Sequence, residues 1–121
     1  MALAFADFNK AIALNPNYAL AYSNRGFIYY DQRKPELAIA DWNTAISLNL
    51  NNAEARMALA VTLYSQGEQT KALAIAEKAL QLDKQFADAA YLKKNLWGEK
   101  IIADTQKLLS HPQIQALLSR L

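Results

Sequence analysis

The sequence repeats itself with a period of 34 residues, and this repeat limits the possible folds more than any other feature. When residues 1–18 are aligned with residues 35–52, ten of the eighteen positions are identical. Aligning residues 19–52 with residues 53–86 gives fewer identities, most of them alanines. Small residues at helical spacing let neighbouring helices approach closely. The period therefore predicts a row of similar helical units, in which each unit buries its apolar face against the next.

Each period contains two amphipathic helices joined by short turns. Apolar residues recur at helical spacing, as at Ala38 and Trp42. Pro16 ends one helix, because proline cannot donate a backbone hydrogen bond and disfavours helical geometry in the residue before it. Pro35 begins another, since the first helical position needs no amide donor, and Gly67 lies in the corresponding turn of the next period. We expect helices over residues 2–14, 19–32, 35–48, 53–66 and 69–82.

The composition favours an all-α fold and excludes several kinds of chemistry. Three glycines and three prolines are too few for the turns of a barrel or sandwich of short strands. The chain has no cysteine and a single histidine, His111, so it cannot build a disulfide framework, a thiolate metal site or a histidine-rich one. We interpret several acidic residues as solvated helix faces or helix caps: Asp41, Glu77, Asp83 and Asp88. We therefore expect no enzymatic activity, no cofactor and no metal site.

Charge and hydropathy give no sign of a nucleic-acid or membrane partner. The formal net charge of +2 is too small to predict either kind of binding. A modest excess of lysine and arginine after residue 84 is interpreted as a solvated surface. No stretch of eighteen apolar residues occurs, and no basic-then-apolar leader. We expect a soluble, cytoplasmic protein that binds no nucleic acid and does not insert into membranes.

One repeat matches a known motif closely, and the chain resembles the tetratricopeptide repeat family over about residues 3–97. The family's aromatic, glycine, tyrosine, alanine and second aromatic positions are filled by Tyr22, Gly26, Tyr29, Ala38 and Trp42. Several positions depart from the pattern: Arg25, Leu50, Arg56 and Ala76. The resemblance implies an α-solenoid of stacked helix-turn-helix units. We expect a single domain over 1–121, divided into a half repeat (1–18), two repeats (19–52 and 53–86) and a degenerate repeat with capping helices (87–121).

The two ends depart from the repeat. The half repeat at 1–18 has no first helix, which indicates either excision from a longer array or a place filled by another chain. At the other end, one stripe at helical spacing runs past Gly98 without a break, at Trp97, Ile101, Thr105, Leu108 and Leu109. It predicts one long capping helix over residues 87–110, with a possible bend at Gly98. A short terminal helix follows Pro112, with an apolar stripe at Ile114, Leu117, Leu118 and Leu121. That stripe either folds back on the long helix or docks on another molecule.

The resemblance implies that the first helices of the units line a concave groove for a partner peptide or helix. By spacing, the groove residues are Leu20, Asn24, Phe27, Tyr30, Met57, Val61, Tyr64, Tyr91 and Asn95. Phe27, Tyr30 and Met57 could equally belong to the packing between helices. The sequence thus predicts a non-enzymatic scaffold that binds another protein. The alternative is a self-associating module, in which residues 1–14 of one chain pair with residues 113–121 of another.

One subtype of the family grips a carboxylate at the end of its partner, and the sequence argues against it here. Asn24 matches an asparagine of this carboxylate clamp. However, Glu54 and Ala58 occupy positions where the clamp requires cations, and Glu54 would repel a peptide carboxylate. The groove is instead expected to hold an apolar extended segment or an amphipathic helix, through buried area and few ion pairs. Such binding should depend weakly on salt.

Overall fold

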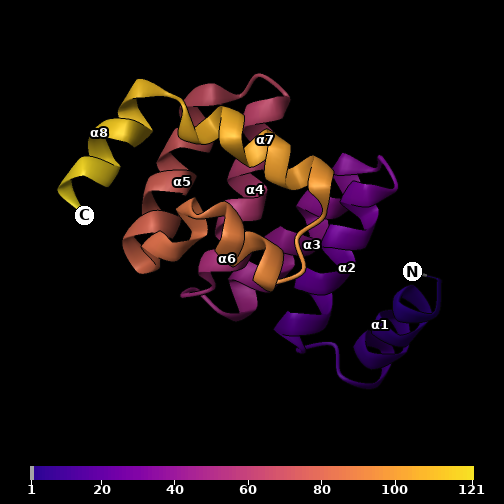
Figure 1. Cartoon of the computed structure of the whole chain (residues 1–121). Coiled ribbons are helices and arrows are strands. Elements are labelled where there is room, and N and C mark those ends of the chain that lie inside the picture. Colours follow the sequence, from indigo (N-terminus) through magenta and orange to yellow (C-terminus); the bar gives the residue numbers. More distant parts are fainter. Residues whose placement is uncertain (1) are drawn as a thin grey trace.

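The protein is all-helical in a computed structural model that describes residues 2–121, with side chains described from residue 4 onward (Figure 1). No strand occurs among these residues. The five helices expected from the repeat are present, with ends that agree to within one residue, so this prediction is confirmed. The elements are α1 (Ala2–Leu14), α2 (Ala19–Asp31), α3 (Pro35–Leu48), α4 (Ala53–Ser65), α5 (Gln69–Leu82), the 3-10 helix η1 (Lys84–Ala87), α6 (Ala89–Lys94), α7 (Glu99–Leu109) and α8 (Pro112–Arg120).

Successive helices pack side by side in chain order. The most extensive contacts join α2 to α3 and α4 to α5, and smaller ones join α1 to α2 and α3 to α4. The turns inside the two pairs share one geometry, because Arg33 and Gly67 both have left-handed backbones, with φ of 63° and 87°. These two residues are 34 positions apart. The all-α solenoid predicted from the period is therefore present.

Small residues allow the close approach of these helices. Ala38, Ala45, Ala72 and Ala79 are fully buried, and each occupies a position that repeats along the chain. Gly26 on α2 faces the buried ring of Trp42 on α3, and a Cβ atom built on Gly26 would lie 2.6 Å from the indole nitrogen. Any larger residue at this position would push α2 and α3 apart, so glycine is required there.

One acidic residue differs from its prediction. Asp41 was expected on a solvated face or at a cap, but only 5% of it is exposed, and it accepts two hydrogen bonds from Arg25 at 2.7 and 2.8 Å. The same guanidinium donates a hydrogen bond to Asn9 at 3.0 Å, so it joins α1, α2 and α3. A buried carboxylate needs a paired cation. Arg25, which departs from the repeat motif, therefore explains why Asp41 can be buried.

The single long helix expected over residues 87–110 is wrong. The segment forms η1 and α6, then a turn over residues 95–98, and then α7. Leu96 has a left-handed backbone with φ of 66°, and the amide of Trp97 donates to the carbonyl of Leu92, which closes the end of α6. Gly98 is extended and lies so close to Asp31 that a Cβ atom would be 2.9 Å from its carboxylate. The apolar stripe continues through this turn, which is why periodicity alone did not reveal it.

The last two helices fold back over the repeats. In Figure 1, α7 crosses in front of α4 and α8 lies beside α5. Ile114 and Leu117 of α8 are buried, whereas Leu121 is 45% exposed. The terminal stripe therefore packs inside this chain, against α5 as well as α7. Among residues 2–121, no helix has the length and apolar character that a membrane crossing requires.

Candidate protein-binding groove

The face that α2 and α4 present to α7, called here the α2/α4 face, is the surface on which the sequence placed a groove. The chain itself occupies much of it. Trp97, immediately before α7, is 4% exposed, and its ring centroid lies 5.1 Å from that of Phe27 on α2. The indole nitrogen of Trp97 donates a hydrogen bond to Glu54 on α4 at 3.1 Å. One side chain therefore joins both walls of the α2/α4 face to α7.

Polar contacts fix the remainder of α7. The Tyr30 hydroxyl on α2 donates a hydrogen bond to Asp104, a buried carboxylate on α7 that also accepts a hydrogen bond from Lys100 at 2.7 Å. Burial raises the pKa of Tyr30, and the bond to Asp104 adds to this shift. Burial alone would raise the pKa of Asp104, but the bonds from Lys100 and Tyr30 outweigh it and hold that pKa below its usual value. Both groups therefore keep the charge states that their hydrogen bond needs.

Three of the predicted groove residues lie beneath this covering helix. Met57 and Val61 are fully buried, and Tyr30 is almost so. Met57 and Val61 lie on the α4 stripe that starts at Glu54, which contacts Trp97, and ends at Tyr64. The Tyr64 ring meets the His111 ring edge-on, with centroids 6.3 Å apart. Because both ends of the stripe touch the segment around α7, the part between them is covered.

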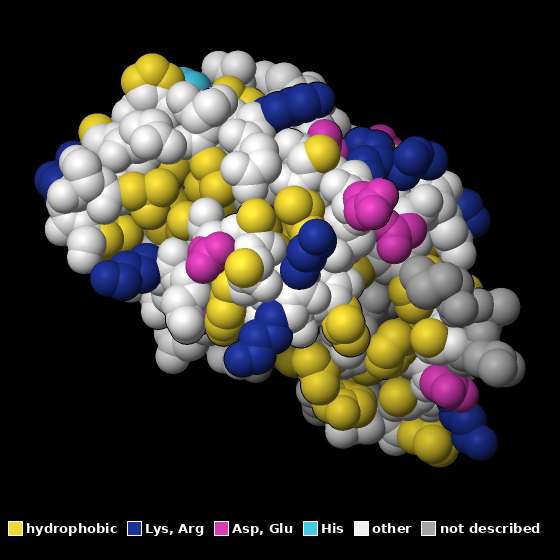
Figure 2. All heavy atoms as spheres, viewed as in Figure 1, with side chains coloured by type: hydrophobic (Ala, Val, Ile, Leu, Met, Phe, Trp, Pro, Cys, Tyr) yellow, Lys and Arg dark blue, Asp and Glu magenta, His cyan; other side chains and the backbone are white. Residues whose placement is uncertain are grey.

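Except for Tyr64, which contacts His111, the other predicted residues border two open hollows. Leu20 and Tyr91 line a cavity of about 440 Å³ at the beginnings of α2 and α4. Asn24 and Asn95, with part of Phe27, line a second hollow of about 280 Å³ between α1, α2 and the turn before α7. Figure 2 shows hydrophobic side chains gathered at lower right, over α1 and α2, beside this second hollow. The structure thus divides the predicted groove into a covered middle and two open ends.

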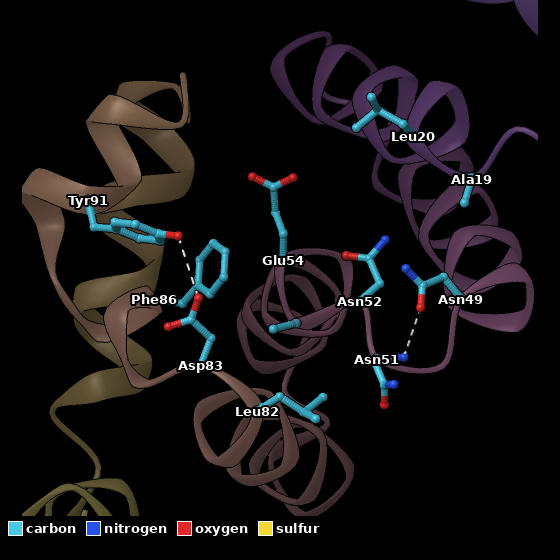
Figure 3. Close-up of a pocket in the computed structure, with 11 residues that line it drawn as sticks. Ala19, Leu20, Asn49, Asn51, Asn52, Glu54, Leu82, Asp83, Phe86 and Tyr91 are labelled. Atoms are coloured by element: carbon cyan, nitrogen blue, oxygen red, sulfur yellow. Dashed lines mark hydrogen bonds between the residues drawn. The ribbon is translucent and has the colours of Figure 1, made fainter.

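The 440 Å³ cavity is more polar than the sequence predicted. Leu20, which is 52% exposed, forms one wall, and Phe86 and Tyr91 form another. Three amides and two carboxylates line the space between these walls: Asn49, Asn51, Asn52, Glu54 and Asp83. Figure 3 shows the Glu54 carboxylate extending into this space from the first turn of α4. The cavity therefore combines apolar walls with a polar, acidic floor.

The two carboxylates are held by neutral donors. The Asp83 side chain accepts from the Gln85 amide at 3.0 Å, as a helix cap, and from the Tyr91 hydroxyl at 3.5 Å (Figure 3). Glu54 accepts only the Trp97 indole bond among the described residues, and burial raises its pKa despite that bond. No described lysine or arginine forms a salt bridge with either acid. Asp83 and Asp88 were predicted to lie on solvated helix faces or at helix caps, and in the structure Asp83 caps η1 and Asp88 caps α6.

Comparison with known families identifies the repeat. A tetratricopeptide repeat model matches residues 24–90, which is more than half of the chain. A second model, described as a TPR repeat, matches residues 2–33. The chain belongs to the tetratricopeptide repeat family. No curated protein matched the chain. Tetratricopeptide repeats generally mediate protein–protein interactions, and the family is typically a non-catalytic scaffold.

Three residues of this tetratricopeptide repeat surface were not among the groove residues predicted from the sequence: Trp97, Phe86 and Asp83. Trp97 belonged to a recognised apolar stripe, but nothing in the stripe indicated that it would pack on the α2/α4 face. Asp83 was interpreted as a solvated or capping residue, and Phe86 was only the last residue of its repeat, so neither was assigned to the groove. A signal was nevertheless present, because Lys93 and Lys94 replace two residues that the motif buries, and both are exposed here. That substitution marks α6 as an irregular unit, after which the chain need not continue the stack.

Proposed function

We propose that this chain is a protein-interaction module that binds a segment of another protein on the α2/α4 face, with the 440 Å³ cavity as the open part of the site. The observation that supports this proposal most directly is α7 itself. It is an amphipathic helix whose apolar residues Ile101 and Leu108 are buried within the chain. The α2/α4 face is therefore suited in shape and polarity to such a segment.

The open cavity offers a partner both apolar area and hydrogen-bonding groups. Leu20 and the rings of Phe86 and Tyr91 supply the apolar walls. Asparagine amides can pair with the backbone of an extended peptide, since each has donor and acceptor atoms. A C-terminal carboxylate is not the expected ligand, because Glu54 and Asp83 would repel it. We therefore propose an internal segment of the partner, rather than its end, as the bound element.

A peptide selection tests this proposal. Random twelve-residue peptides displayed on phage are selected against the full chain, and the affinities of the selected peptides are measured by fluorescence anisotropy. Leu20→Gln removes an apolar wall without changing charge, and it should weaken binding by roughly tenfold or more, as expected for the loss of a buried leucine contact. Leu14→Gln is the matched control, because Leu14 is 78% exposed and lies outside the cavity. Equal affinities for the two variants would contradict the proposal.

Self-association through residues 1–14 and 113–121 is the second candidate, and the structure favours it less. Met1 lies outside the described residues, and the α8 stripe that would pair with another copy is largely buried against α5 and α7. Such pairing would therefore require α8 to leave its place. Sedimentation of the full chain and of a chain ending at Ser110 tests this alternative. A monomer in both cases would remove it.

A further inference from the structure

The cavity at the start of α4 has an unbalanced set of charges. Its lining includes two carboxylates, those of Glu54 and Asp83, and no lysine, arginine or histidine. At neutral pH the cavity therefore carries negative charge, although the chain as a whole has a formal charge of +2. This local reversal of sign favours a cationic group over a neutral or anionic one.

The Glu54 carboxylate is placed to receive such a group. Only one of its oxygens, Oε2, accepts the indole bond from Trp97, at 3.1 Å. The carboxylate extends into the space between Leu20 on one side and Phe86 and Tyr91 on the other (Figure 3). A partly buried carboxylate that lacks a cation loses hydration without full compensation. A partner's cation would supply that compensation.

The walls match the aliphatic portion of a long basic side chain. The rings of Phe86 and Tyr91 meet edge to face, with centroids 5.1 Å apart, so they form a rigid aromatic wall. Lysine and arginine pack their methylene stems on apolar surfaces and keep the charged group in a polar environment. An aromatic face next to the charge adds a favourable cation–π interaction. At about 440 Å³, the cavity lies in the lower part of the range of roughly 300–1,000 Å³ that ligand pockets occupy.

We propose that this cavity binds a lysine or arginine side chain of the partner segment, with Glu54 and Asp83 facing the cation and Leu20, Phe86 and Tyr91 holding its stem. The inference rests on the proposed function, and it specifies the residue that the partner must present. It adds one ion pair to the apolar contacts and amide hydrogen bonds of the proposed site. The carboxylate-clamp members of the family bind a negatively charged group of the partner, whereas this cavity would bind a positively charged one.

Small blocked amino acids test the inference without a known partner. Nα-acetyl-lysine amide and Nα-acetyl-arginine amide, which keep the side-chain charge, are titrated into the ¹⁵N-labelled full chain. Nα-acetyl-norleucine amide is the uncharged control. The chain has two tryptophans. The Trp97 indole is bonded to Glu54, whereas the Trp42 indole is bonded to the Ser23 carbonyl and serves as an internal reference. The basic probes should shift the Trp97 signal saturably and leave the Trp42 signal unchanged.

Two variants separate charge from structure. Glu54→Gln keeps an oxygen that can accept the indole bond but removes one of the two negative charges, so the response to the basic probes should become clearly weaker. Glu36→Gln makes the same change on the exposed start of α3, outside the cavity, and should respond like the wild type. Equal shifts with lysine and norleucine probes would overturn the inference. So would an undiminished response in Glu54→Gln.

The selected peptides distinguish this inference from the proposed function. They should contain a lysine or arginine, and replacing it with norleucine should weaken binding by about tenfold, as for the loss of a charged hydrogen bond. Peptides that require Leu20 but contain no essential basic residue would overturn the cation site and leave the groove intact. Peptides that bind Leu20→Gln as well as the wild type would instead contradict the groove itself.

Discussion

Replacing Trp97 with alanine should destabilise the protein by about 4 kcal/mol, because this side chain fastens the C-terminal segment to the repeats. Its ring lies 5.1 Å from the Phe27 ring and 6.1 Å from the Phe86 ring, and each aromatic pair contributes roughly 0.5–1.5 kcal/mol beyond simple burial. Its indole bond to Glu54 contributes about 1 kcal/mol more. Together these contacts contribute roughly 2–4 kcal/mol before the burial of the ring itself is counted. Truncation of a buried tryptophan commonly costs about 3–5 kcal/mol in total, so a loss of about 4 kcal/mol is expected.

Urea unfolding measures the effect. Far-UV circular dichroism reports total helix, and in the Trp97→Ala variant Trp42 is the remaining tryptophan, so its fluorescence reports the α2–α3 packing alone. With a slope of about 2 kcal/mol per molar urea, the midpoint should fall by about 2 M. Leu96→Ala, at an adjacent side chain that is 89% exposed, is the matched control and should change stability by less than about 0.5 kcal/mol. A loss below about 1 kcal/mol for Trp97→Ala would refute the described packing.

Three further predictions follow from backbone, hydrogen bonding and charge. Leu96→Gly should raise the melting temperature, with a gain of about 0.5–1 kcal/mol, because glycine relieves the left-handed strain, and a lower melting temperature would argue against that backbone. Tyr30→Phe should cost about 1–2 kcal/mol in urea unfolding, since Asp104 loses a donor but keeps its lysine, and an unchanged free energy of unfolding would contradict the bond. Burial raises the pKa of Glu54, so the folded state binds that proton more tightly than the unfolded state does. Ionised Glu54 therefore destabilises the fold above its folded pKa. The free energy of unfolding of Glu54→Gln should exceed that of the wild type at pH 7, and the difference should disappear toward pH ~4. A difference that does not change with pH would contradict the burial of the carboxyl.

The repeating part of the fold could be predicted because each unit carries the same local information. Alanines at fixed positions and the breaks at Pro16 and Pro35 set the helix ends, and the structure follows them closely. Arg33 shows why the match survives an unfavourable residue. It takes the left-handed conformation that Gly67 takes one period later, since the packing of the helix pair requires that turn whatever residue fills it.

The C-terminal segment could not be predicted in the same way. Its helical stripe was recognised, but the chain turns at Leu96, a residue type that rarely adopts a left-handed backbone and so gives no local signal. The destination of the stripe depends on distant contacts, such as those of Trp97 with Phe27 and Glu54. Spacing along one helix carries no information about such contacts.

The candidate site could also be predicted only in part, because it too depends on contacts between segments that are far apart in the sequence. Helical spacing placed Met57 and Val61 on one stripe of α4, and both are buried in the structure, as is Tyr30 on α2. It could not show that α7 covers these three, because that requires knowing where the chain returns. The acidic character of the open cavity was also missed. Asp83 reaches it from the end of α5, a position outside the first helices that the family resemblance singles out.

Because α7 covers part of the α2/α4 face, a free helix that binds the same surface must compete with it. A helix tethered to the surface that it occupies is present there at an effective concentration in the millimolar range. A free helix of equal intrinsic affinity, supplied at micromolar concentration, would displace it in only about one molecule in a thousand. A ligand that first binds surface left open by α7 does not have to displace this helix. The presence of α7 therefore limits which ligands can bind here.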